Sequence, residues 1–141
     1  MRPAVFIDTW AWVALVVTDD PAHQRAEAAL AKLRGQGALL VTSNFVLAET
    51  LTRLRYDFGL PAALRLERVV ALLRTNGWVD AQVVDDAVWA AALDWFRRFD
   101  DQRFSFVDCT SFAIMAQRGI SEALTGDRHF AAAGFVPLGV A

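Results

Sequence analysis

The segment AVFIDTWAWVALVV, residues 4–17, joins two patterns of different kind. AVFID, residues 4–8, is a short apolar run of the buried-strand type that ends in a carboxylate. Asp8 and Thr9 are good N-caps for a helix formed by WAWVALVV, residues 10–17. A buried strand that leads directly into a helix favours an α/β fold, in which helices pack on a sheet.

The alternation of strands and helices continues along the rest of the sequence. Further strands are expected at 38–44, 78–84 and 122–127, with a last one in FVPLG at 135–139, and further helices at 19–37, 45–59, 61–77, 87–100 and 107–118. Such alternation requires crossover connections and therefore a mainly parallel sheet with helices on both faces. We expect one domain, residues 1–141, built as a three-layer α/β/α sandwich with a short central sheet.

Polar residues mark where the expected helices begin. Pro21 is expected at the first helical position of the second helix. The candidate N-caps of the later helices are Asp19 or Asp20, then Thr42, Ser43 or Asn44, then Asp85 or Asp86, and finally Asp108. Each aspartate among these candidates therefore has a possible role as a helix cap, which competes with any role in a functional site.

Composition limits the class of protein. The chain has 141 residues, of which 55% are hydrophobic, enough to fill the core of one domain. The formal charge of -2 argues against nucleic-acid binding by bulk electrostatics, although residues 53–74 hold five arginines against two acidic residues. The single Cys109 excludes an internal disulfide and a cysteine-cluster zinc site. The single cysteine also fits a reducing compartment, and no apolar run is long enough to span a membrane, so the cytoplasm is the expected location.

Four acidic residues stand where an α/β fold places its ligands. Asp8 and Asp127 end predicted strands, Asp108 begins a helix, and Glu49 lies about one turn into another. Ligands of open α/β sheets bind at the carboxyl ends of the strands, so all four could reach the same end of the sheet. Intervals of 41, 59 and 19 residues separate them, so only tertiary structure could bring them together.

Each acid also has a simpler explanation. Asp8 and Asp108 would serve as helix caps, Asp127 follows a glycine as turn aspartates often do, and Glu49 would pair with Arg53 at i,i+4. Together these explanations weaken, because two carboxylates about 5 Å apart repel by roughly 3 kcal/mol at an effective dielectric constant near 20. Such a cluster must take up protons or bind a cation.

The expected cation is Mg²⁺ or Mn²⁺, since both suit a site made of oxygen ligands. Zinc is less suitable, because His23 and His129 are the only histidines and are not spaced as a ligand pair; a structural or surface role is expected for both. A metal site of this kind is suited to hydrolysis of a phosphodiester bond. Thr9 and Ser111 would orient a water or a phosphate oxygen. Contact with the nucleic-acid backbone is expected from the arginine-rich stretch: Arg53, Arg55, Arg65 and Arg68.

The motifs VFIDTWAWVAL (5–15), TSNFVLAETLTRLR (42–55), FSFVDCTSFAIM (104–115) and ALTGDRHFAAAGF (123–135) resemble the four acidic motifs of PIN-domain ribonucleases, in particular VapC-type toxins of toxin–antitoxin pairs. The resemblance implies a Mg²⁺- or Mn²⁺-dependent endoribonuclease that cleaves tRNA or ribosomal RNA. It implies that Asp8 and Asp108 bind the metal directly, while Glu49 and Asp127 act through water or a second ion. Thr9 and Ser111 fall on hydroxyl positions near the metal.

The resemblance further implies a homodimer that a cognate antitoxin silences, with DNA contacted only indirectly through the antitoxin complex. Gly126 departs from the family pattern, in which a bulkier residue often precedes the fourth acid, and this affects the expected stiffness of the loop. Two other functions remain open. An acidic-pocket phosphatase or phosphotransfer domain is disfavoured because DTW (8–10) lacks the second aspartate of a DxD motif, and a non-catalytic binding domain would use its acids only as helix caps.

Overall fold

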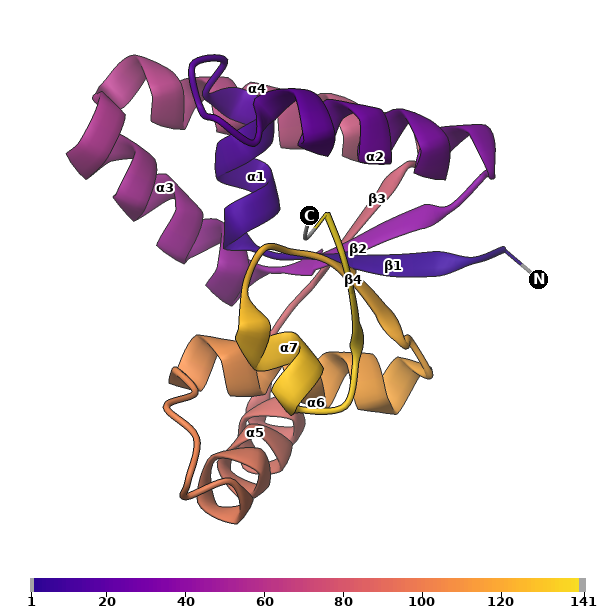
Figure 1. Ribbon diagram of the computed structural model, residues 1–141, viewed down its shortest axis with the longest axis vertical. Coiled ribbons are helices and arrows are strands. Elements are labelled where there is room, and N and C mark those ends of the chain that lie inside the picture. The colour runs from indigo at the N-terminus through magenta and orange to yellow at the C-terminus, as the bar shows by residue number, and fades with distance from the viewer. Residues whose placement is uncertain (1, 140–141) are drawn as a thin grey trace.

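The computed structural model describes residues 2–139, and these contain one five-stranded sheet in which every pair of neighbouring strands is parallel (Figure 1). The order of the strands is β3-β2-β1-β4-β5. The expected domain 1–141 extends at both ends over residues outside this range. The strands are β1 (Ala4–Ile7), β2 (Leu39–Ser43), β3 (Val79–Gln82), β4 (Glu122–Leu124) and β5 (Val136–Leu138).

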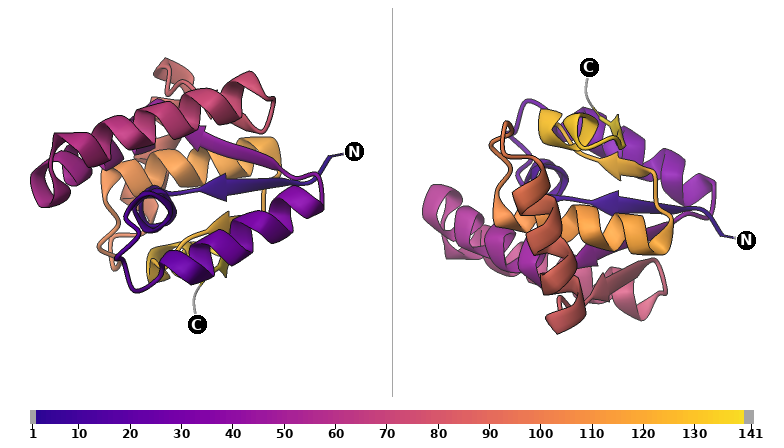
Figure 2. Two further views of the ribbon diagram at one scale, coloured as in Figure 1. Left: turned by 90° about the horizontal axis from the view of Figure 1, so that it is seen from above. Right: turned by 90° about the horizontal axis from the view of Figure 1, so that it is seen from below.

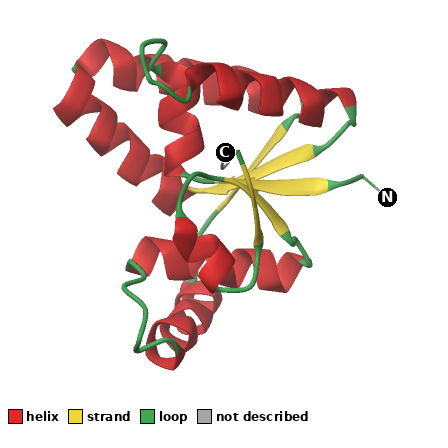
Figure 3. Cartoon of the chain, viewed as in Figure 1, coloured by secondary structure: helices red, strands yellow, loops and turns green. Residues whose placement is uncertain are grey.

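Helices cover both faces of this sheet. Those on one face are α1 (Thr9–Val16), α2 (His23–Gly35), α3 (Asn44–Phe58) and α4 (Leu60–Thr75), and those on the other are α5 (Asp86–Arg98), α6 (Phe106–Arg118) and α7 (Arg128–Ala132). Figures 2 and 3 show the two helical layers with the strands between them. The predicted three-layer α/β/α sandwich with a parallel sheet is confirmed. Within residues 2–139, no helix is both long and apolar enough to cross a membrane.

The order of the strands explains which helices lie on which face. The chain moves outward from β1 through β2 to β3, then returns to place β4 on the other side of β1. Crossovers between parallel strands are nearly always right-handed, so helices before and after this reversal must lie on opposite faces. The reversal makes the gap between β1 and β4 a topological switch point, the place where α/β proteins bind their ligands.

The core lies on both sides of the central strands. Phe6, Ile7 and Leu40 are fully buried, as expected for strands covered on both faces. Among the tryptophans, Trp12 is fully buried, whereas Trp89 keeps 47% of its surface exposed. The buried strands and the helices above and below them hold the switch point in a fixed geometry.

Several element boundaries differ from the predictions. α2 begins at His23 rather than at Pro21, because the Asp20 carboxylate accepts a hydrogen bond from the Ala22 amide (2.8 Å) and holds the chain in a turn. β3 ends at Gln82, since the Val84 amide donates to the side chain of Asn44 instead of continuing the strand (2.8 Å). β4 also ends earlier, and the five-residue α7 was not predicted because so short a helix carries little periodicity.

Candidate functional site

A pocket opens at the carboxyl ends of β1 and β4, at the switch point of the sheet. The four acids Asp8, Glu49, Asp108 and Asp127 all line it. They reach it from the end of β1, from α3, from the first turn of α6 and from the loop after β4. The other residues of the wall are Thr9, Trp10, Val46, Arg53, Val107, Ser111, Gly126 and Phe130. The structure therefore brings together four carboxylates that lie far apart in the sequence.

Asp8 is the most deeply buried of these acids, with 7% of its surface exposed. It is the N-cap of α1: Oδ1 accepts a hydrogen bond from the Ala11 amide (3.3 Å), and Oδ2 accepts one from the Thr125 hydroxyl (2.6 Å). Burial raises the pKa of Asp8 from 3.8 to about 7 against the lowering effect of these two hydrogen bonds, and the charges of Asp127 and Asp108 add to the rise. In the absence of a cation, Asp8 therefore holds a proton up to near-neutral pH.

Asp108 is not the N-cap that the sequence suggested. Ser105 occupies that position, and its hydroxyl accepts from the Asp108 amide (3.0 Å) while Asp108 Oδ2 accepts from the Ser105 amide (3.1 Å). This reciprocal pair is a capping box, with Asp108 at the third helical position. Burial first and Asp127 second raise the Asp108 pKa, and the hydrogen bond with His129 opposes the rise. Within residues 2–139 no hydrogen bond reaches Oδ1 of Asp108, so that oxygen is available to a ligand.

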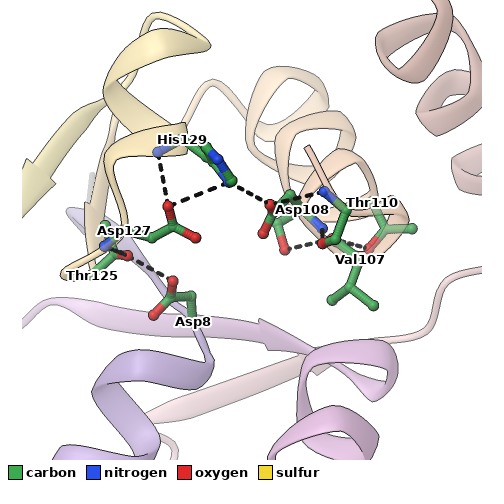
Figure 4. A network of polar contacts seen from close by, with 9 residues as sticks. Asp8, Val107, Asp108, Thr110, Thr125, Asp127 and His129 are labelled. Carbon is green, nitrogen blue, oxygen red and sulfur yellow. Dashed lines mark hydrogen bonds and ion pairs between the residues drawn. The ribbon is translucent and has the colours of Figure 1, made fainter. Parts of the chain in front are cut away.

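His129 lies between two of the acids (Figure 4). Its Nδ1 is 3.1 Å from Asp108 Oδ2 and 3.4 Å from Asp127 Oδ1, and its backbone amide donates to the same oxygen of Asp127 (2.9 Å). A structural or surface role without a visible partner was expected for this histidine. Its partner Asp108 lies 21 residues away along the chain, a separation that no local spacing rule detects.

Thr125 is a second residue that the sequence did not single out. Its hydroxyl donates to Asp8 Oδ2 and accepts from the Asp127 amide (2.9 Å), so it joins the first and fourth acids. A threonine two residues before an aspartate in a turn is a known local signal, because its hydroxyl can bind the backbone two positions on. The contact with Asp8 has no such signal, because 117 residues separate the two side chains.

Glu49 lies on α3 and is half-buried. Burial raises its pKa, the charge of Asp108 adds to the rise, and Arg53 and the Thr9 hydroxyl lower it. Among the described residues no ion pair within 4 Å joins Glu49 to Arg53. The alternative in which Glu49 serves only as the i,i+4 partner of Arg53 is therefore not the arrangement found, and both side chains line the pocket.

The predicted supporting residues differ in their distance from the acids. Thr9 and Ser111 line the pocket, and the Ser111 hydroxyl donates to the Val107 carbonyl (3.2 Å). Among the four predicted arginines only Arg53 lines the described pocket. Arg55, Arg65 and Arg68 are exposed on α3 and α4, where Arg65 donates to the Val16 carbonyl (3.1 Å).

The composition of the pocket suits a hard divalent cation. Four carboxylates face one arginine in its wall, and the pKa of three of them is raised by burial and by one another. Ligand atoms of Asp108, Asp127 and His129 lie within 4.8 Å of one another. Carboxylate oxygens are ligands that hard divalent cations accept, and a dication would allow the buried acids to ionise.

Comparison with known proteins agrees with this geometry. The family model described as the PIN domain matches residues 5–136. The 23S rRNA-specific endonuclease VapC20 of Mycobacterium tuberculosis is 37% identical over 132 residues, which cover 94% of this chain and 95% of that protein. The crystal structure of M. tuberculosis VapC20, described as a sarcin-ricin loop cleaving toxin, superposes with a TM-score of 0.82 at 36% identity, over 94% of this chain and 96% of the other.

A more distant structure shares only the fold. VapBC2 from Rickettsia felis, bound to a DNA fragment from its promoter, superposes with a TM-score of 0.68 at 10% identity, over 95% of this chain and 96% of the other. The family match and the more similar relative confirm the resemblance drawn from the four sequence motifs.

Proposed function

This chain belongs to the PIN-domain family, and on that premise we propose that it is a metal-dependent endoribonuclease toxin that hydrolyses phosphodiester bonds of ribosomal RNA. The observation that carries the proposal is the convergence of Asp8, Glu49, Asp108 and Asp127 on one pocket at the switch point of the sheet. Helix capping alone does not explain this convergence, because the convergence brings mutually repelling carboxylates together and capping does not require it. A site that binds a dication gives the arrangement a purpose.

Asp8 and Asp108 would hold Mg²⁺ or Mn²⁺ directly, and Glu49 and Asp127 would act through water or hold a second ion. When bound, the cation supplies Lewis acidity and lowers the pKa of the water that it holds. These assignments are supported by the Oδ1 of Asp108, which accepts no hydrogen bond from the described residues, and by the place of Asp8 in the pocket wall. Thr125 keeps Asp8 oriented through its 2.6 Å hydrogen bond, and the capping box keeps Asp108 oriented.

The remaining residues of the pocket would handle the substrate. Thr9 and Ser111 have hydroxyls that can orient a water or a phosphate oxygen. Arg53 supplies a positive charge in the wall for an RNA phosphate. Arg55, Arg65 and Arg68 would then contribute only at a distance, to RNA or to a partner, since they lie outside the pocket.

The substrate class follows from the relative rather than from the pocket. VapC20 is named as a 23S rRNA-specific endonuclease, and the match covers 94% of the present chain. We therefore prefer ribosomal RNA over tRNA as the substrate. We further propose that residues 1–141 act as one domain in the cytoplasm, form a homodimer, and are neutralised by a cognate antitoxin. Any contact with DNA would then be made through the antitoxin complex.

The proposal is tested by incubating the purified protein with 23S rRNA and, separately, with tRNA. Cleavage of the ribosomal RNA is expected in Mn²⁺ or Mg²⁺, with none in EDTA and none for Asp108→Asn protein whose melting temperature shows that it is folded. Undiminished cleavage in EDTA would contradict the metal mechanism. Cleavage of tRNA alone would overturn the substrate class and leave the nuclease assignment intact.

A further inference from the structure

Gly126 departs from the family pattern, and its backbone conformation does not account for the glycine. Six glycines of the described chain have a positive φ, which favours a residue without a side chain, and Gly126 is not among them. Gly35 shares this property, but a Cβ placed on Gly35 would meet nothing within 4 Å. Position 126 is different, because the space beside it is already occupied.

The indole of Trp10 occupies that space. A Cβ on residue 126 would lie 2.3 Å from Nε1 and Cε2 of Trp10 and 2.8 Å from Cδ1, distances at which one group must move. The indole is a rigid ring in the first turn of α1, two residues after Asp8, and its packing against the hydrophobic core limits its movement. A side chain at residue 126 would therefore require the indole or the loop to move.

The other end of the same ring meets Gly139, the residue after β5. A Cβ on Gly139 would lie 3.2 Å from Cζ3 and 3.5 Å from Cη2 of Trp10. Trp10 thus spans from the loop that carries Asp127 to the segment after β5, and it also lines the acid pocket. Trp12, two positions later, differs because it is fully buried and donates from Nε1 to the Thr42 hydroxyl (3.3 Å).

We propose that Trp10 is a positioning residue for the acid pocket and that Gly126 is its reciprocal partner. The loop is held on one side of Gly126 by Thr125, which bonds Asp8, and on the other by Asp127, which contacts His129. A side chain at position 126 would push this short loop off the indole. Asp127 would then move away from Asp108 and Asp8, the carboxylates with which it would hold a cation.

The inference rests on the proposed function for its biological meaning, yet it can be tested by metal binding alone. Four proteins are compared by calorimetry with Mn²⁺: the wild type, Gly126→Ala, Trp10→Ala and the double variant. Gly126→Ala is expected to weaken Mn²⁺ binding about tenfold or more, the size typical for residues that orient metal ligands. Trp10→Ala is expected to weaken it by a smaller factor, because the loop loses its support without being displaced.

The double variant tests reciprocity. Removing the indole frees the space for the new methyl group, so Trp10→Ala/Gly126→Ala is expected to bind Mn²⁺ more tightly than Gly126→Ala. Gly35→Ala is the matched control, since it adds a methyl group in open space at a φ that alanine accepts, and it should bind as the wild type does. If Gly126→Ala does not fold, recovery of folding in the double variant tests the same reciprocity, and Trp10→Ala alone still tests positioning.

Two outcomes would overturn the inference: unchanged Mn²⁺ binding in Gly126→Ala, or equal losses in Gly126→Ala and the double variant. Failure of the proposed function looks different. If the wild type binds Mn²⁺ and the variants show the expected coupling, but no RNA is cleaved, then the positioning role stands and the ribonuclease assignment falls.

Discussion

The N-termini of α1 and α5 are built alike and yet lie in very different surroundings. Asp8 caps α1 with φ -96° and ψ -179°, and Asp85 caps α5 with φ -93° and ψ -173°. Each accepts a hydrogen bond from the backbone amide three residues later, Ala11 at 3.3 Å and Val88 at 3.0 Å. Each also closely follows a strand of the parallel sheet. Both aspartates therefore serve as N-caps with the same local geometry.

What differs is the position of the preceding strand in the sheet. β1 is the central strand, with β2 and β4 on either side, so Asp8 is buried and faces acids that arrive from other segments. β3 is an edge strand, and Asp85 is exposed to solvent. A helix cap becomes a candidate metal ligand when its strand adjoins the switch point, because that is where other loops converge.

The sharpest test of this difference exchanges each aspartate for asparagine, which keeps a capping oxygen and removes the charge. Asp8→Asn is expected to lower RNA cleavage by more than about a hundredfold, since loss of groups that merely support metal ligands already costs about 10- to 100-fold. Asp85→Asn should cleave at the rate of the wild type. Initial rates with Mn²⁺ measure both, and similar losses in the two variants would remove the distinction.

Stabilisation by a bound metal ion should also distinguish Asp8→Asn from Asp85→Asn. A dication that binds only the folded state at a hundredfold excess over its Kd adds about 2.7 kcal/mol of stability. The melting temperature of the wild type and of Asp85→Asn should therefore rise by roughly 5 to 10 °C on addition of Mn²⁺. Asp8→Asn is expected to show little of this rise. A full rise in Asp8→Asn would mean that the cation binds elsewhere.

The stability of the metal-free protein is expected to fall as the pH rises. Burial raises the pKa of Asp8 to about 7, so folding favours the protonated acid and its stabilisation is lost as the pH rises towards and through that value. Between about pH 5.5 and about pH 7.5 the metal-free protein is expected to lose about 2 kcal/mol of unfolding free energy from Asp8. The pKa values of Glu49 and Asp108 are also raised, so their titration changes the stability in the same direction.

Urea denaturation in metal-free buffer at the two pH values measures this loss. Asp8→Asn should show a clearly smaller decrease than the wild type, because it has no carboxyl group to titrate at this position. Asp85→Asn should retain the whole decrease. The assignment to Asp8 is contradicted if Asp8→Asn and the wild type lose the same free energy.

The smallest expected effect is the structural one. Asp85→Ala removes the side chain that accepts from the Val88 amide and should cost about 1 kcal/mol of stability, the usual cost of losing an N-cap. Cleavage and Mn²⁺ affinity should stay at the wild-type level. Chemical denaturation checks the first expectation and calorimetry the second. A loss of Mn²⁺ affinity would show that α5 contributes to the pocket after all.

Local patterns in the sequence account for most of the fold. The strand that ends at Asp8, the apolar run at β2 and the helices between them follow from burial patterns and caps, and the parallel sheet follows from their alternation. The error at the start of α6 arose because two local explanations competed. Asp108 and Ser105 are both good caps, and the capping box that assigns them different positions depends on the backbone geometry of the turn.

The candidate site was predictable in part. The four acids stand out because each occupies a strand end or lies near a helix start, and the structure gathers them in one pocket, while their catalytic roles remain predictions. Thr125 was not singled out, and His129 was expected in a structural or surface role, since their contacts with Asp8 and Asp108 join residues 117 and 21 positions apart. Such contacts leave no periodic or spaced signal in a single sequence.

The sequence by itself determined the order of the strands and the longer helices, the N-cap of α1 and the four acidic positions, because these depend on interactions between residues a few positions apart. Only the tertiary structure decided which acids are buried together, which histidine lies between them, and why residue 126 is glycine. Those properties depend on the central place of β1 in the sheet and on the indole of Trp10 beside Gly126. The same local cap is a solvent-exposed helix start at Asp85 and a buried acid with a raised pKa at Asp8.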